Sequence, residues 1–385
     1  MRPFNGTISS KLPNTGTSIF AHMSGLAQQH NAINLAQGFP GFDCSPQLKT
    51  LVKQYMDKGY NQYAPMPGVL ALREVIAEKM ASRYAIDLNV ETEVTVTAGA
   101  TQALFTAITA IVKPGDEVIV FTPAYDCYIP AIELCGGIVK PVDLIYPDYQ
   151  INWATVKGLI SEKTKAIIIN TPHNPSSTLW CDADMQKLIS LVKNTNIIVI
   201  SDEVYEAITF DGKKHLSVLN YPELAERSFV IYSFGKVYHN TGWKTGYAIA
   251  PKVLSAEFRK IHQHLVFSVN TPVQYALADF MKNDEITNSL SGLFQQKRNL
   301  FLSLLNQSKF EFTPAEGTYF QLLNYKLISD EPDTVFAEKL TINHGVAAIP
   351  LSVFYADKID SKTLRFCFAK TDDELERAAE RLCKI

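Results

Sequence analysis

Two kinds of apolar pattern alternate along this chain. Residues 70–84, 101–112 and 184–193 place apolar side chains at helical spacing. Between these stretches lie short, continuous apolar runs at 94–97, 117–121, 166–170, 197–201 and 229–233. Continuous apolar runs are typical of strands in a parallel sheet that helices cover on both faces. The pattern therefore predicts an α/β fold in which helices flank a mostly parallel sheet.

The pattern changes near residue 285, where a long helical stretch begins. Strand-like pieces follow at 318–323 and 364–369, and a charged helix is expected at 372–383, with its acidic start favoured by the helix dipole. The chain has 385 residues, more than the roughly 250–300 at which a single core stops growing. We therefore predict a large domain over 46–284 and a smaller α+β domain built from an N-terminal arm, 1–45, together with 285–385.

Composition and charge exclude several classes of partner. Hydrophobic residues make up 46% and charged residues 19% of the chain, and the net charge is −3, so no positive field favours nucleic acid. No apolar run approaches the roughly 20 residues of a membrane span, and the N-terminus lacks the apolar core of a secretory signal. We expect a cytoplasmic protein. The six cysteines include no CxxC pair, and His262 and His264 cannot share a helix face, so we expect no disulfide and no metal site.

Polar residues follow several of the predicted strands. Ligands of open α/β sheets bind beyond the carboxyl ends of the strands. The turn Ala98-Gly-Ala-Thr-Gln102 opens a helix and offers amides to a phosphate, although a packing role would explain such a turn equally well. Asp202 and Tyr205 follow another run, where a lone Asp is more often a helix cap. Asn174 lies in a loop fixed by two prolines, which alone is equally a plain loop.

A lysine completes this set. Lys236 ends Ser233-Phe-Gly-Lys236 after the last apolar run, where a lone lysine is usually only solvated. With these neighbours, a buried lysine amine could form an imine with an aldehyde, a carboxylate could pair with a pyridine nitrogen, and Tyr125 could stack on the face of the ring. Ser233, Lys244 and the helix amides suit a phosphate. Together the group types indicate pyridoxal 5'-phosphate.

These ordered motifs resemble those of the fold-type-I, class I and II aminotransferases, the aspartate aminotransferase superfamily. The resemblance covers nearly the whole chain, and Leu35-Ala-Gln-Gly-Phe-Pro-Gly-Phe42 and Gly242-Trp-Lys-Thr-Gly246 are most similar to the methionine, kynurenine and glutamine-phenylpyruvate aminotransferases. It implies transamination between an L-amino acid and a 2-oxo acid by a ping-pong mechanism, with pyridoxal 5'-phosphate as cofactor.

The resemblance also implies a role for each matching residue. Lys236 would hold the cofactor and shuttle the proton, Asp202 would face the pyridine nitrogen, and Tyr205 and Asn174 would contact the ring oxygen. The phosphate positions fall on Gly99, Ala100, Thr101, Ser233 and Lys244. Arg365, Gly38 and Asn174 match residues that contact the substrate carboxylate. Tyr63 matches a tyrosine that reaches the partner subunit's phosphate, so the resemblance implies a homodimer with shared active sites.

The sequence departs from the family in three places. Lys244 stands where many members have Arg and leaves a second lysine that could compete with Lys236. Asn174-Pro-Ser-Ser-Thr replaces the more usual Asn-Pro-Thr-Gly, and Gly235 stands where Ser is common. The candidates for the side-chain pocket are apolar or aromatic and favour methionine or aromatic amino acids over aspartate: Ile19, Phe20, Phe39, Tyr125 and Phe267.

Other functions stay open at this point. A carbon–sulfur β-lyase would use the same lysine and cofactor but eliminate the β-substituent of its substrate. A regulatory or binding domain without catalysis would need a DNA-binding region, and the residues before the first motif are too few and not basic enough. A nicotinamide-dependent dehydrogenase is disfavoured because no G-x-G-x-x-G follows a strand.

Overall fold

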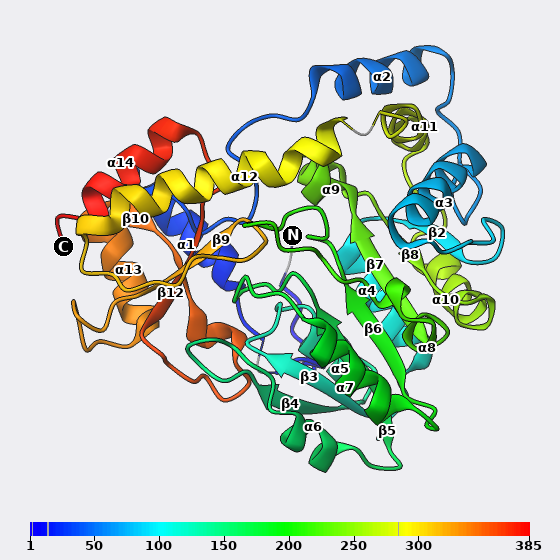
Figure 1. The fold of residues 1–385 in the computed structure, drawn as a ribbon, viewed down its shortest axis with the longest axis horizontal. Coiled ribbons are helices and arrows are strands. Elements are labelled where there is room, and N and C mark those ends of the chain that lie inside the picture. The colour runs from blue at the N-terminus through cyan, green and yellow to red at the C-terminus, as the bar shows by residue number, and fades with distance from the viewer. Residues whose placement is uncertain (2, 14, 284) are drawn as a thin grey trace.

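The computed structural model describes residues 1, 3–13, 15–283 and 285–385 (Figure 1). Within these residues, the main sheet has seven strands, in which β8 alone runs antiparallel to its neighbours. Their spatial order is β2 (Val94–Thr97), β8 (Gly246–Ile249), β7 (Ser228–Ser233), β6 (Ile198–Asp202), β5 (Thr164–Asn170), β3 (Glu117–Thr122) and β4 (Ile138–Asp143). The predicted fold class, a mostly parallel sheet flanked by helices, is confirmed.

Alternate residues of the central strands pack into two separate hydrophobic clusters. Ala166 and Ile168 of β5 join α4 (Ala100–Ile111), α5 (Tyr128–Leu134) and α10 (Lys252–Leu265) on one face. Ile167 and Ile169 join α3 (Leu70–Tyr84) and α7 (Asp182–Val192) on the other. A strand whose successive side chains are all buried in this way must read as a continuous apolar run. The runs in the sequence therefore have a direct physical cause.

A smaller lobe packs beside the carboxyl ends of the parallel strands. It combines the C-terminal elements with α1, which Figure 1 shows in blue among the orange and red segments. β1 pairs with β10 in parallel, and β12 lies between β11 and β9 in an antiparallel sheet. Its elements are α1 (Ile19–Gln29), β1 (Ile33–Asn34), α12 (Glu285–Leu304), β9 (Phe320–Asn324), α13 (Asp333–His344), β10 (Val346–Ala347), β11 (Ile349–Pro350), β12 (Thr363–Cys367) and α14 (Asp372–Leu382).

Most predicted elements differ from the structure by one or two residues at their ends. The helix over 70–84 and the strand over 94–97 are found with the predicted bounds, and the predicted strand at 318–323 begins two residues late, at Phe320. The last helix begins at Asp372, where Thr371 and Glu374 cap each other reciprocally, as its acidic start indicated. Among the described residues, no helix has the length and apolarity needed to cross a bilayer.

Short elements connect these layers. They are α2 (Pro46–Asp57), α6 (Trp153–Leu159), α8 (Pro222–Ala225), α9 (Phe234–Val237), α11 (Thr271–Phe280), η1 (Val218–Asn220), η2 (Thr241–Trp243), η3 (Leu305–Gln307) and η4 (Leu351–Phe354). Of these, α9 directly follows β7 and contains Lys236, and Lys244 is the C-cap of η2.

Candidate active site

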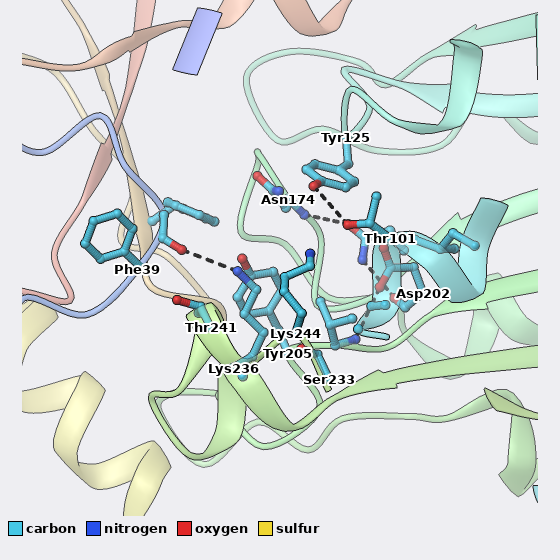
Figure 2. A pocket seen from close by; sticks show the side chains of 18 of the residues that line it. Phe39, Thr101, Tyr125, Asn174, Asp202, Tyr205, Ser233, Lys236, Thr241 and Lys244 are labelled. Carbon is cyan, nitrogen blue, oxygen red and sulfur yellow. Dashed lines mark hydrogen bonds between the residues drawn. The ribbon is translucent and has the colours of Figure 1, made fainter. Parts of the chain in front are cut away.

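One cavity lies between the strand ends of the main sheet and the smaller lobe. Asp202 ends β6, Lys236 lies in α9 just after β7, and Arg365 comes from β12 of the smaller lobe. Figure 2 shows Asp202 and Lys236 with Thr101 and Tyr125 around a common space. The predicted site residues that line it are Gly38, Gly99, Ala100, Thr101, Tyr125, Asn174, Asp202, Tyr205, Ser233, Lys236, Lys244 and Arg365.

The amine of Lys236 is enclosed and held by two oxygen atoms. Its Nζ donates hydrogen bonds to the Tyr319 hydroxyl at 3.0 Å and to the Gly38 carbonyl at 3.3 Å. Burial lowers the pKa of Lys236 to about 8, and among the described residues no carboxylate forms an ion pair with it. A lowered pKa leaves more of the amine in the neutral, nucleophilic form.

Lys244 lies beside Lys236 in the cavity but in a different environment (Figure 2). It is exposed to solvent and adopts the left-handed conformation at the end of η2, with φ 52°. The lysine side chain ends in a compact point charge that binds anions, and this one lies beside Gly99 at the start of α4. The two lysines are therefore suited to different tasks.

Asp202 is a buried carboxylate with few protein partners. It is 3% exposed, accepts a hydrogen bond from Tyr128 at 2.6 Å and accepts one from the Val204 amide at 3.3 Å. Burial raises the pKa of Asp202 to about 6, against these bonds, which lower it. A carboxylate in this setting is stabilised by a cation placed in the cavity. A protonated pyridine nitrogen fits that requirement.

The start of α4 forms a cradle for an anion. Gly99, its N-cap, has φ 79° and ψ 169°, a conformation essentially restricted to glycine. No side chain caps this end, so the first amides of the helix are available to a ligand. A Cβ atom on Gly99 would lie 3.5 Å from the Lys244 Nζ, so the lysine charge sits at the same place. The site thus suits a phosphate.

Arg365 is the buried cation on the opposite wall. It is 1% exposed, donates to the Asn174 side chain at 2.7 Å and to the Ala36 carbonyl at 3.3 Å, and its Nε has no partner. Its guanidinium carbon lies 3.9 Å from the centre of the Phe320 ring. Among the described residues no carboxylate pairs with Arg365, so the site is suited to a carboxylate supplied by a ligand.

Three other residues considered in the sequence lie outside the cavity. Tyr63 is 83% exposed and packs edge-on against Phe267 at 5.3 Å. Phe267 is itself 48% exposed, and Ile19 packs against the core from α1. Ile19 and Phe267, two of the candidates for the side-chain pocket, are therefore not among the lining residues of this cavity, because periodicity cannot show which apolar side chains converge. Phe20, Phe39 and Tyr125 do line the cavity.

Sequence reasoning missed two tyrosines that contact the central groups. Tyr128 bonds Asp202, and Tyr319 bonds Lys236. Tyr128 is the first residue of α5 and lies three residues after Tyr125, which precedes the helix, and the two rings meet edge to face at 5.9 Å. No comparable signal marks Tyr319, because it reaches the site only when the smaller lobe folds against the main sheet.

The departures from the family pattern have local explanations. A Cβ atom on Gly235 would lie 2.9 Å from the Thr241 Cα, so glycine lets the two lysine segments approach. Ser177 takes the left-handed conformation, with φ 64°, where glycine is the more usual residue. Its hydroxyl bonds the Thr318 hydroxyl at 2.8 Å and the Phe320 carbonyl at 2.9 Å, which offsets the strain.

Comparisons with known proteins agree with this geometry. The family model for aminotransferase class I and II matches residues 30–382. A methionine aminotransferase of Escherichia coli is 52% identical, over 98% of both chains. A solved structure from Escherichia coli, described as having a methionine aminotransferase function, superposes with a TM-score of 0.96, at 51% identity, over 98% of this chain and 100% of its own. A kynurenine–oxoglutarate transaminase of Dictyostelium discoideum is 34% identical over 98% of this chain and 96% of its own. An N-succinyldiaminopimelate aminotransferase of Mycobacterium tuberculosis superposes with a TM-score of 0.94, at 33% identity, over 98% and 100% of the two chains.

Proposed function

Because the chain belongs to the class I and II aminotransferases, we propose that it binds pyridoxal 5'-phosphate on Lys236 and uses it to transfer amino groups from an apolar L-amino acid to a 2-oxo acid. Transamination follows from the family. The observation that carries the residue assignment is that the half-buried amine of Lys236 and the buried carboxylate of Asp202 line one cavity together with an uncapped helix start.

The residues around the cavity account for each part of the cofactor. The α4 amides of Ala100 and Thr101, with Ser233 and Lys244, would hold the phosphate. Asp202 would pair with the pyridine nitrogen and keep it protonated. Tyr205 and Asn174 line the same cavity and would bond the ring oxygen, while Tyr125 would stack on the ring.

The reaction needs a group that moves a proton at the substrate Cα. Bound pyridoxal phosphate supplies an electron sink that makes this proton acidic. Lys236 is the basic group whose pKa, about 8, lies near neutrality, so its Nζ can both take up and return the proton. Arg365 would fix the substrate carboxylate through two parallel N–H donors, assisted by the Gly38 backbone and by Asn174.

The substrate class follows from the cavity wall. Phe20, Phe39 and Phe320 line the cavity together with Tyr125, and no acidic or basic side chain other than those assigned above lies among its lining residues. An apolar wall stabilises a thioether or an aromatic side chain and disfavours a second carboxylate. Methionine, the substrate in the name of the Escherichia coli relative, fits this wall, and we propose methionine and aromatic amino acids as donors.

We propose further that the enzyme is a cytoplasmic homodimer with shared active sites. Tyr63 is 83% exposed beside the half-exposed Phe267, which is consistent with a place in an interface where Tyr63 reaches the partner's phosphate. The six cysteines are scattered along the sequence without a CxxC pair, which supports a reducing compartment. The pairing of β1 with β10 supports a small domain of 1–45 and 285–385 beside a large domain of 46–284.

A substrate panel tests the proposed function. The purified protein loaded with pyridoxal phosphate is mixed with single amino acids, and the change in cofactor absorbance is followed before and after a 2-oxo acid is added. We expect methionine and aromatic amino acids to react faster than aspartate, and a 2-oxo acid to restore the first spectrum. Release of pyruvate and ammonia from cystathionine, without amino transfer, would instead identify a β-lyase.

A further inference from the structure

Tyr319 connects the catalytic lysine to the segment between β1 and α2. The residue directly precedes β9 and is fully buried, with 0% exposure. Its hydroxyl accepts the hydrogen bond from the Lys236 Nζ at 3.0 Å and donates one to the Gly38 carbonyl at 2.6 Å. Gly38 lies more than two hundred residues from Tyr319 in sequence, on the segment between β1 and α2. One phenol therefore connects three separate parts of the chain.

The direction of these bonds fixes the direction of the amine. The Tyr319 proton is directed at Gly38, so the phenol oxygen can offer Lys236 only a lone pair. A neutral lysine amine has two N–H donors and one lone pair. Its two donors are used by Tyr319 and by the Gly38 carbonyl, which lies 3.3 Å away. The lone pair of the amine is then the part left free to accept a proton from the cavity.

The tyrosine itself has little freedom to move. Its ring meets Tyr205 edge to face at 5.2 Å and 89°, and Phe294 at 5.6 Å. Burial raises the pKa of the Tyr319 hydroxyl well above its usual value, so the group stays protonated and does not itself act as a base. It is suited to orienting another group.

We propose that Tyr319 is a positioning residue that holds the free Lys236 amine, together with the Gly38 carbonyl, with its lone pair toward the substrate Cα. This inference rests on the proposed function, because it concerns the interval in which Lys236 is not joined to the cofactor. Tyr319 touches neither the substrate nor the cofactor in this role, and acts through Lys236.

The test begins with cofactor-free protein, in which Lys236 is a free amine. Tyr319→Phe removes one hydroxyl and keeps the ring. The pH dependence of arylation by trinitrobenzene sulfonate, measured at Lys236 by peptide mass spectrometry, reports the pKa of this amine. A hydrogen-bond acceptor stabilises the ammonium form more than the neutral form, so we expect the midpoint to fall by about one pH unit in the variant. An unchanged midpoint would overturn the proposal.

Tyr325→Phe is the matched control. Tyr325 is also fully buried in the smaller lobe and donates to one carbonyl, that of Glu331, at 2.8 Å, but it lies outside the cavity. Its loss should leave the Lys236 midpoint where the parent protein has it. A shift equal to that of Tyr319→Phe would show a general effect of removing a buried hydroxyl and would also overturn the proposal.

The loaded enzyme gives a second measurement. We expect Tyr319→Phe to lower kcat by about tenfold, because the base is less well oriented, while cofactor affinity stays within about twofold. If Tyr319→Phe does not fold, 3-fluorotyrosine introduced at position 319 keeps the ring and hydroxyl but weakens the acceptor, and the midpoint should fall by less. Failure of the parent protein to bind pyridoxal phosphate would refute the proposed function alone, since the arylation experiment needs no cofactor.

Discussion

Replacing Tyr128 by Phe should raise the pH below which the protein loses its affinity for pyridoxal phosphate. Tyr128 donates to the Asp202 carboxylate at 2.6 Å, in a place where Asp202 is 3% exposed. Burial already raises the pKa of Asp202 to about 6, and the Tyr128 bond is the largest of the interactions that oppose this rise. Without the hydroxyl the carboxylate loses its best stabilising contact in the cofactor-free protein.

The size of the shift follows from that bond. A hydrogen bond to a charged group contributes about 1.5–3 kcal/mol, which corresponds to about one to two pKa units. The pKa of Asp202 in the variant should therefore be about 7–8, against about 6 in the parent protein. Only ionised Asp202 pairs with the protonated pyridine nitrogen. Affinity is thus full above the pKa of Asp202 and is lost as the pH falls through it.

The assay is the dissociation constant of pyridoxal phosphate from the cofactor-free protein between pH 5 and 9. Titration of the ligand itself is common to all proteins compared, so the difference between them isolates Asp202. Tyr232→Phe is the control, because Tyr232 is equally buried and donates to Glu203 at 2.9 Å, a carboxylate outside the cavity. The reasoning is refuted if Tyr128→Phe and the parent protein lose affinity at the same pH.

Three further substitutions have defined outcomes. Asp202→Asn should abolish transamination yet raise the unfolding free energy of the cofactor-free protein at pH 7 by up to about 3 kcal/mol, because a carboxyl whose pKa is raised from 3.8 to about 6 destabilises the fold as the pH rises through that window. Chemical denaturation should show this gain at pH 7 and not at pH 4. Arg365→Lys should lower kcat/KM for methionine by about a hundredfold, mainly through KM, since the second parallel donor is lost; steady-state kinetics would show an unchanged KM if the assignment is wrong. Gly99→Ala should destabilise the protein by about 1–3 kcal/mol and weaken cofactor binding, whereas Gly59→Ala, at φ 87° with open space around it, should change only the melting temperature.

Continuous apolar runs made the main sheet predictable from the sequence. Ile167 and Ile169 face one helical layer and Ile168 faces the other, so every position of this part of β5 is buried and apolar. The direction of β8 was not predictable, because a short run such as that at 246–249 carries no information about parallel or antiparallel pairing. The ends of the strands were likewise predicted only to within one or two residues.

The candidate site was predictable where residues follow a strand in sequence. Asp202 and Lys236 each lie at or just after the end of a strand of the main sheet, and such ends meet at one edge. Contacts made across the two lobes were not predictable from local pattern. Tyr319 reaches Lys236 across 83 positions of sequence, and the exclusion of Ile19 and Phe267 from the cavity depends on packing that periodicity does not specify.

The central claim is that Lys236, and not the neighbouring Lys244, holds the cofactor. Borohydride reduction of the loaded enzyme fixes pyridoxal phosphate covalently to the amine that binds it, and peptide mass spectrometry then locates the added mass. The enclosed amine of Lys236, with its pKa lowered to about 8, should carry the label, and Lys236→Ala should remove it while Lys244→Ala keeps it at reduced occupancy. A label found on Lys244 in the parent protein would contradict the account.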